Sequence, residues 1–189
     1  MADAGAPERQ VRALFDDETI TVYQAYAPQV AEAALAAGTF VAPFKRDRMT
    51  WIKPSFLWMM HRSGWATKPG QERVLAVRIS RDGFEWALRH ASLSHDAANT
   101  GARPVRVQWD PERSLQLERL DHRAIQIGLS ADVAGRYVDE WITSLSDVTP
   151  LAHEIHALVE AGDLDTARGR LPIERAYRLP ADVRAIVGA

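Results

Sequence analysis

The sequence predicts an α+β protein with a mixed or antiparallel sheet in its first two thirds and a mainly helical last third. Segments rich in β-branched and aromatic residues are concentrated before residue 131. Helical patterns separate these segments and then dominate the rest of the chain. A hydrophobic content of 47% is ordinary for a protein with a packed core. We therefore expect a flexible tail over residues 1–8 and a single α+β domain over residues 9–189.

The first elements alternate strands with short helices. A strand is predicted over residues 19–26 by "TITVYQAY", and a helix over 28–38 by "PQVAEAALAAG", which opens with proline and ends with glycine. Short extended pieces, "TFVAPF" and "RMTWI", are predicted on either side of the charged turn at 45–47. A proline then fits the first turn of a helix over about 54–62, which the following Ser-Gly pair ends.

The middle of the chain predicts three further strands and a helix. Residues 74–80, "VLAVRIS", read as a buried strand, and "DGFEWALRHAS" after it reads as a helix. Residues 104–110 and 123–130 alternate as half-buried strands do. From residue 131 onward, amphipathic helices are predicted in "DVAGRYVDEWITSL" and "PLAHEIHALVEAG". The end of the chain predicts two proline-marked turns and a last short helix.

Composition excludes several classes of function. The net charge is -2, from 25 acidic and 23 basic residues, which argues against coating nucleic acid through bulk charge but allows a local basic face. The absence of cysteine excludes disulfides, thiol catalysis and zinc–thiolate sites. Neither a signal-peptide pattern nor a run of ~20 apolar residues is found, so a cytoplasmic protein without membrane contact is expected.

The strongest candidate for function is residues 48–68, "RMTWIKPSFLWMMHRSGWATK", which holds three of the six tryptophans. If a helix begins after Lys53, the free backbone N–H groups of its first turn and the Ser55 hydroxyl would suit a phosphate or carboxylate. Arg48 and Lys53 would neutralise its charge while Trp51 stacks on a flat ring. The alternative is that the apolar residues form core and the cations are simply solvated.

Further polar candidates fall on predicted strands and at the end of the predicted helix. Gln24 lies near the end of the first strand, and Arg62 lies at the end of the helix after Pro54. Arg123 and Gln126 fall on opposite faces of the last strand, so only one of them is expected to face a cleft. Either could hold an anionic or amide group. Gly128 suggests either a β-bulge or a close backbone approach.

Motifs with a fixed chemistry are missing. The chain has no Walker loop, no G-x-G-x-x-G and no G-x-S-x-G, and the catalytic residues stay unassigned. Glu72, Asp110 and Glu174 are nominations for a general base. His153 and His156 lie three residues apart, one short of the zinc-protease spacing, and no third ligand follows a known pattern. We therefore expect no metal site.

Several of these motifs resemble an uncharacterised family, domain of unknown function 4291. They are "VYQAY", the segment at 48–68, "GFEWAL", "VQWDPER", "RAIQIGL", "YVDEWI" and "LPIERAY". A weaker similarity is to the ADP-ribosyltransferase class, which implies NAD binding without a Rossmann fingerprint. That class carries Arg or His on an early strand, Ser or Tyr on a middle strand and Glu on a late strand. The early strand here, "TITVYQAY", has neither Arg nor His.

Three functions follow in order of preference. The first is an enzyme that binds a nucleotide, NAD or a similar small molecule, with the cations of residues 48–62 on its phosphates and a glutamine at its polar edges. The second is a non-catalytic module for RNA or single-stranded DNA, which would use the same aromatic and basic side chains. The third is a protein-interaction domain anchored by exposed tryptophans. Substrate, reaction and oligomeric state are left open.

Overall fold

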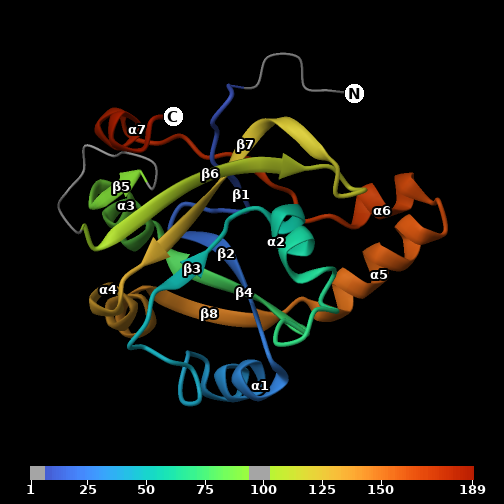
Figure 1. Ribbon diagram of the computed structural model, residues 1–189, viewed down its shortest axis with the longest axis horizontal. Helices are drawn as coiled ribbons and strands as arrows, with labels where there is room; N and C mark the ends of the chain where they lie inside the picture. The colour runs from blue at the N-terminus through green and yellow to red at the C-terminus, as the bar shows by residue number, and fades with distance from the viewer. Residues whose placement is uncertain (1–6, 94–102) are drawn as a thin grey trace.

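Two antiparallel or mixed sheets and a ring of helices make up the fold, which a computed structural model describes for residues 7–93 and 103–189 (Figure 1). The three-stranded sheet has the order β2 (Thr19–Tyr26), β4 (Arg73–Ser80), β8 (Ile142–Asp147). The four-stranded sheet has the order β3 (Thr50–Ile52), β7 (Arg119–Leu129), β6 (Val105–Arg113), β5 (Ala91–Leu93). Among the strands that the structure describes, only β5 and β6 pair in parallel, so the predicted α+β class with a mixed or antiparallel sheet is confirmed.

Short helices fill the connections between the strands. They are α1 (Pro28–Ala37), α2 (Phe56–Ser63), α3 (Arg81–Arg89), α4 (Ala131–Arg136), the π-helix η1 (Tyr137–Trp141), α5 (Thr149–Glu160), α6 (Leu164–Arg170) and α7 (Ala181–Val187). A small two-stranded sheet joins β1 (Arg12–Ala13) to β9 (Arg175–Ala176), so an early and a late segment of the chain lie side by side. None of the helices in the described residues has the length and apolar character that crossing a membrane needs.

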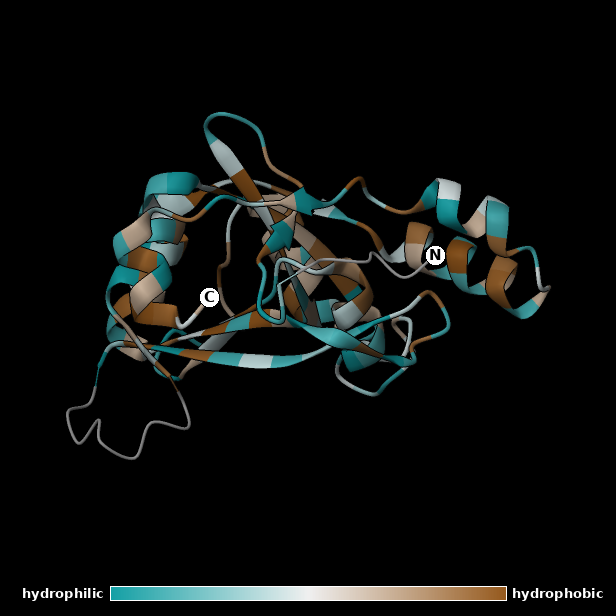
Figure 2. Ribbon diagram, turned by 90° about the horizontal axis from the view of Figure 1, so that it is seen from above, coloured by the Kyte–Doolittle hydropathy of each residue, from teal (hydrophilic) through white to brown (hydrophobic). Residues whose placement is uncertain are grey.

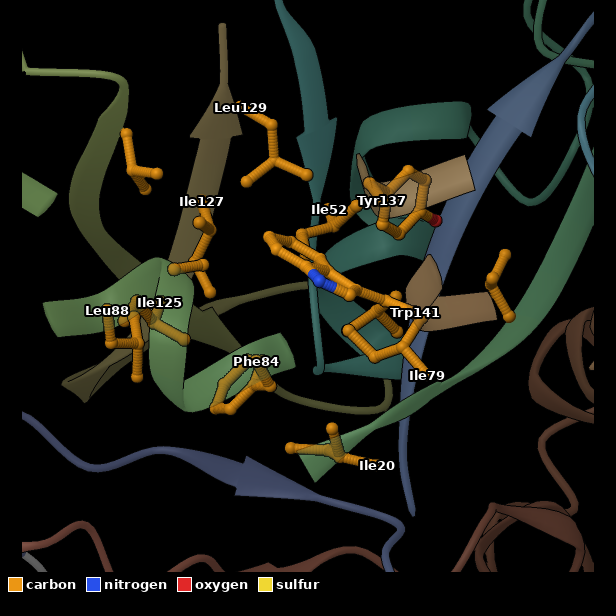
Figure 3. Close-up of a cluster of buried hydrophobic side chains, with 14 of the residues drawn as sticks. Ile20, Ile52, Ile79, Phe84, Leu88, Ile125, Ile127, Leu129, Tyr137 and Trp141 are labelled. Atoms are coloured by element: carbon orange, nitrogen blue, oxygen red, sulfur yellow. The ribbon is translucent and has the colours of Figure 1, made fainter. Parts of the chain in front are cut away.

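The main hydrophobic core lies where the two larger sheets and α3 and η1 meet (Figure 3). Trp141 sits at its centre, beside Ile79 and Phe84. A Cβ atom at Gly83 of α3 would lie only 2.4 Å from Trp141 Cγ, so glycine is what lets this helix approach the indole ring. The core therefore depends on one small residue inside a helix, where glycine otherwise costs about 1 kcal/mol relative to alanine.

A second hydrophobic cluster holds α2, α5 and α6 against one end of the three-stranded sheet. Figure 2 shows hydrophobic and hydrophilic residues interleaved along α5 and α6, as expected for helices that bury one side. Phe56 and Met60 of α2 contribute fully buried side chains, and Ile155 of α5 does the same. This cluster fixes the orientation of α2 relative to β2 and β4.

Most predicted elements are present, with differences at several places. The helix predicted in "DGFEWALRHAS" ends at Arg89, and Ala91–Leu93 forms β5. The predicted extended piece 39–44 forms bends and turns. The helix predicted from Pro54 begins at Phe56, with Ser55 as its N-cap. The amphipathic helix predicted after residue 131 ends at Trp141, and the next residues form β8 because they pair with β4 at the edge of the three-stranded sheet. Most of the predicted tail, residues 1–6, lies outside the described residues, but Glu8 O accepts from Arg123 N at 2.7 Å.

Candidate functional site

A cavity of about 440 Å³ lies between β2, β3, α2 and β7, and we call it the β3–α2 cavity. Six of the eight predicted ligand-binding residues line it: Gln24, Arg48, Trp51, Lys53, Arg62 and Gln126. Trp58 and Tyr26 add aromatic surface, and Gln71 contributes a polar side chain from the turn before β4. β2, β3 and α2 are labelled in the centre of Figure 1, and β7 is labelled above them. The predicted residues therefore converge on one place, although they come from four separate parts of the chain.

The Trp51 ring lies across the backbone of β7. Trp51 is paired with Gly128 in the antiparallel register of β3 and β7. A Cβ atom at Gly128 would lie 2.9 Å from Trp51 Cη2 and 3.0 Å from Met49 Sδ, closer than a side chain tolerates. Of the two sequence expectations for Gly128, the structure shows a close approach, made by side chains, and the pairing of β7 with β3 and β6 has no register shift at this residue. Because strand residues alternate between faces, Ile52 enters the core while Trp51 and Lys53 face the cavity.

Lys53 forms a buried, cationic part of the cavity wall. Only 4% of the residue is exposed, and its Nζ lies 4.6 Å from the ring centroid of Trp58 and 5.9 Å from that of Trp51. Among the described residues no side chain forms an ion pair or hydrogen bond with this Nζ. Burial, with the nearby charge of Arg62, lowers the pKa of Lys53 to about 8, and Asp110 partly opposes this change.

Arg48 and Arg62 place two further cations on the cavity. Arg48 lies on the bend before β3, and Arg62 lies in the last turn of α2. Both residues are exposed, and within the described part of the chain neither guanidinium has a carboxylate or hydrogen-bond partner. By contrast, Arg46 nearby is paired with Asp139 at 2.7 Å. The cavity thus carries three cations and no ion pair to neutralise them.

Positive charge continues along α2 beyond the cavity. Burial lowers the pKa of His61, and the charges of Arg113, Lys68, Arg119 and Arg62 lower it further. His61 also lies edge-on to the ring of Trp58, with centroids 6.3 Å apart. The helix therefore presents a basic surface next to the cavity as well as inside it.

Two glutamines border the cavity but differ in how they are held. The side chain of Gln24 is 1% exposed: its Nε2 donates to Tyr26 Oη at 2.8 Å, and its Oε1 accepts from Tyr137 Oη at 2.6 Å. Gln126 Nε2 donates to Gln108 Oε1 at 2.5 Å and to Asp110 Oδ2 at 2.7 Å. Because both donors of Gln126 are directed at β6, its carbonyl oxygen is the group left for a ligand.

Two predicted residues do not reach the cavity. Arg123 faces the other side of β7, where it donates to Trp109 O at 3.0 Å and pairs with Glu8. Ser55 is the N-cap of α2: its Oγ accepts from Trp58 N at 3.1 Å and donates to Glu112 Oε1 at 2.8 Å. Strand alternation explains why Arg123 is turned away while Gln126 faces the cavity.

The expected anion site at the N-terminus of α2 is occupied by the protein's own carboxyl group. Phe56 N donates to Glu174 Oε1 at 2.7 Å, although the two residues are 118 positions apart. Part of Glu174 is accessible to solvent, but its carboxyl group lies among protein atoms. Burial, together with the negative charge of Glu112, raises its pKa to about 8, although the hydrogen bond from Phe56 N opposes this rise. This helix end is therefore not free to bind a phosphate.

Glu112 and Glu174 form a pair of buried carboxyl groups that the sequence does not reveal as a pair. Burial raises the pKa of Glu112 as well, while hydrogen bonds from Arg113 N and Ser55 Oγ oppose that rise. Arg12 lies close enough for its charge to lower both pKa values. The sequence analysis nominates Glu174 as a general base, whereas no local sequence pattern points to a role for Glu112. Glu112 lies on β6 next to the N-cap of α2, and predicting that position requires knowing how the strands pair.

The comparisons with known proteins identify a family. The chain matches the family described as Domain of unknown function (DUF4291) over residues 10–177. It belongs to this family. No curated protein matches the chain.

Every residue that lines the β3–α2 cavity lies inside the DUF4291 match, as do Glu112 and Glu174. Helix α7 and the end of the chain lie beyond it. The DUF4291 region thus contains the whole cavity together with the elements that shape it. The described residues of this DUF4291 chain hold no group of three or more side chains suited to a metal ion. The residues around the near-zinc spacing on α5 have other contacts. The ring of His156 stacks on that of Trp65, with 5.3 Å between centroids, and Glu154 pairs with Arg170.

Proposed function

We propose that the β3–α2 cavity binds a nucleotide or an NAD-like ligand, on which the protein acts as an enzyme. The observation that carries the proposal is the convergence of Arg48, Lys53 and Arg62 on a cavity walled by Trp51 and Trp58. None of the three cations has an ion pair with a residue in 7–93 or 103–189. Cations bind phosphate, and tryptophan faces bind flat rings. About 440 Å³ also falls within the range of small-ligand sites.

The polar rim supports a ligand with amide or hydroxyl groups. Gln126 offers a carbonyl oxygen, and Thr50 and Gln71 add polar groups at the same cavity. An early, a middle and a late strand (β2, β3 and β7) meet here, which agrees with the weaker similarity to NAD-binding ADP-ribosyltransferases. The early and late strands bring Gln24 and Gln126, whose amides cannot carry charge or take up a proton at neutral pH. We therefore propose an NAD-like ligand, but we do not propose ADP-ribosyl transfer as the reaction.

Charge reversal at the two exposed cations tests this proposal. Tryptophan fluorescence and thermal shift should show saturable binding of at least one of AMP, ATP, NAD or ADP-ribose. Arg48→Glu combined with Arg62→Glu should weaken that binding at least about tenfold, since two charge-assisted contacts are lost. Arg168→Glu is the matched control, because Arg168 is exposed on α6, away from the cavity, and pairs with Asp165 of the same helix. Unchanged affinity in the double variant would exclude the cavity as the site.

The basic surface along α2 supports one second candidate, a single-stranded RNA or DNA ligand. Arg113, Arg119 and Lys68 act on His61 together with Arg62, so positive charge extends further than one nucleotide needs. Binding along a nucleic-acid backbone weakens steeply with salt because counterions are released. A mononucleotide in the cavity should lose much less affinity over the same salt range. Titrations with AMP and a short RNA at two salt concentrations separate the candidates.

A further inference from the structure

Lysine is rare in this chain, and one lysine lies in the cavity wall. Of the 23 basic residues only three are lysines: Lys45, Lys53 and Lys68. Lys45 is exposed, and Lys68 is exposed and donates to the carbonyl oxygens of Arg62 and His61 at the end of α2. A guanidinium stays protonated in proteins, whereas an amine can lose its proton and become a nucleophile. Lys53 is thus the only cation lining the cavity that can react as a neutral amine.

The surroundings of Lys53 favour the neutral amine. Its backbone is fixed by β2, since Tyr23 N donates to Lys53 O at 2.7 Å, and Pro54 follows it. Its Nζ lies beside the rings of Trp51 and Trp58 and has no ion pair among the residues that the structure describes. Since burial lowers its pKa to about 8, a sizeable fraction of Lys53 is uncharged near neutral pH. Desolvated lysines next to other cations are used in this way for covalent catalysis.

We propose that Lys53 is a nucleophile that forms an imine with an anionic aldehyde or ketone, such as the open-chain form of a sugar phosphate. The inference rests on the proposed function for its anion site, because Arg48 and Arg62 would hold the phosphate of this ligand. It adds to that function a reacting group and a substrate class. A phosphorylated reducing sugar, free or as part of a nucleotide, offers both the anion and the carbonyl carbon.

The reaction balances without a further reagent. The nitrogen lone pair of neutral Lys53 adds to the carbonyl carbon, and a proton passes from this nitrogen to the carbonyl oxygen, which gives a carbinolamine. The hydroxyl group then leaves as water with the remaining proton of the nitrogen, and this forms the carbon–nitrogen double bond of the imine. Asp110 lies close enough for its charge to favour protonated Lys53, and it would favour a protonated imine for the same reason.

Reductive trapping with ribose 5-phosphate tests the inference in the full chain. Sodium cyanoborohydride delivers a hydride to the imine carbon, which leaves a stable secondary amine on the lysine. The mass added is that of the sugar phosphate less one oxygen atom, and peptide mass spectrometry assigns it to Lys45, Lys53 or Lys68. At pH 7 we expect Lys53 to be labelled at least about tenfold faster than the two exposed lysines, given its lower pKa.

Three controls connect the label to the cavity. Lys53→Arg should abolish the fast labelling, while Lys45→Arg should leave it unchanged. Ribose, which lacks the phosphate, should label Lys53 several-fold more slowly, and so should ribose 5-phosphate with Arg62→Gln. Because Lys53→Arg can affect folding, the pH profile of the unaltered chain gives a second measurement. Labelling of Lys53 should level off above pH about 8, while labelling of Lys45 keeps rising.

The outcomes separate this inference from the proposed function. Equal labelling of all three lysines, or none at Lys53, overturns the inference. If AMP or NAD binds in the fluorescence assay and Lys53 is still not labelled, the nucleotide site stands and the imine is rejected. If Lys53 is labelled selectively and no nucleotide binds or competes, the imine stands and the nucleotide site is rejected. Selective labelling that AMP suppresses supports both.

Discussion

At the scale of single residues, Gly128 sets the position of the Trp51 ring. The indole lies where a side chain on β7 would otherwise stand, with 2.9 Å between Trp51 Cη2 and the Cβ that any other residue would have. Trp51 is only partly buried, so it can move away if the space is filled. One glycine therefore determines whether the cavity has a fixed aromatic wall.

Gly128→Ala should leave the protein folded but displace Trp51. We expect a loss of about 1–2 kcal/mol in the free energy of unfolding from overpacking, and a shift in tryptophan emission. Affinity for the nucleotide that binds the unaltered chain should fall several-fold, which a fluorescence titration measures. Gly135→Ala is the matched control, because nothing lies within 4 Å of a Cβ there and the residue is in helix α4. Equal affinities in the two variants would contradict a role for Trp51 in binding.

At the scale of elements, α2 is held at its N-terminus by groups from distant segments. Glu112 from β6 accepts from the Ser55 hydroxyl, and Glu174, just before β9, accepts from Phe56 N. The carboxyl groups repel each other when both are ionised, and burial also opposes ionisation. Protonation of Glu174 thus stabilises the junction between α2 and the end of the chain.

This arrangement predicts a pH-dependent stability. The pKa of Glu174 is raised to about 8 in the folded state, above its unfolded value, so the folded state binds more protons between about pH 4.5 and 8. Its contribution to stability is present at low pH and is lost as pH rises through about 8. Glu174→Gln keeps an acceptor for Phe56 N and removes the ionisation. We expect this variant to be more stable than the unaltered chain by about 1–2 kcal/mol at pH 8.

Denaturant titrations at pH 5 and pH 8 measure this difference. The gain of Glu174→Gln should be small at pH 5, because the unaltered carboxyl group is then protonated in the folded state. Glu118→Gln, at an exposed position on the β6–β7 turn, is the matched control for loss of a negative charge. A gain of equal size at both pH values would show that the carboxyl group is ionised throughout this range. Comparing variants at one pH also removes the opposite contribution of His61, whose pKa is lowered.

Elements also show how far the sequence could predict the site. Alternation along β3 places Trp51 and Lys53 on one face of the strand, so the local sequence pattern is sufficient to predict that these two side chains lie together. It was not enough for Ser55, because its acceptor Glu112 lies 57 residues away and depends on the pairing of distant strands. The strand β8 was missed for the same reason: its sequence fits an amphipathic helix, and only the free edge of β4 makes it a strand.

At the scale of the whole molecule, the cavity lies where the two larger sheets meet. β2 belongs to one sheet, and β3 and β7 belong to the other. The junction is bridged by Tyr23 N, which donates to Lys53 O, and by Gln24 Nε2, which donates to Trp51 O at 3.2 Å. On its other side Gln24 accepts from Tyr137 of η1. This convergence could not be predicted from sequence, since it depends on how the sheets pack.

Tyr137→Phe tests this junction. The variant leaves the buried Oε1 of Gln24 without its 2.6 Å donor, and an unsatisfied buried acceptor costs about 1–3 kcal/mol. We expect that loss in the free energy of unfolding, together with weaker ligand binding, because Gln24 also holds the backbone of Trp51. Thr39→Val is the control: it removes a hydroxyl that donates to Val138 O at a partly exposed site, where water can replace it. If the free energy of unfolding fell equally in both variants, the hydrogen bond from Tyr137 to Gln24 would stabilise the protein no more than a partly exposed one does.

The pairing of β3 with β7 restricts where the chain can change in length. β3 has three residues, and a slip of one position in its register would exchange its two faces. Ile52 would then point into the cavity, while Trp51 and Lys53 would be driven into the hydrophobic core. Insertions and deletions can be absorbed by the turns between α1 and β3, which form no ladder. Within β3 itself, a single lost residue would both unfold the core and erase the site.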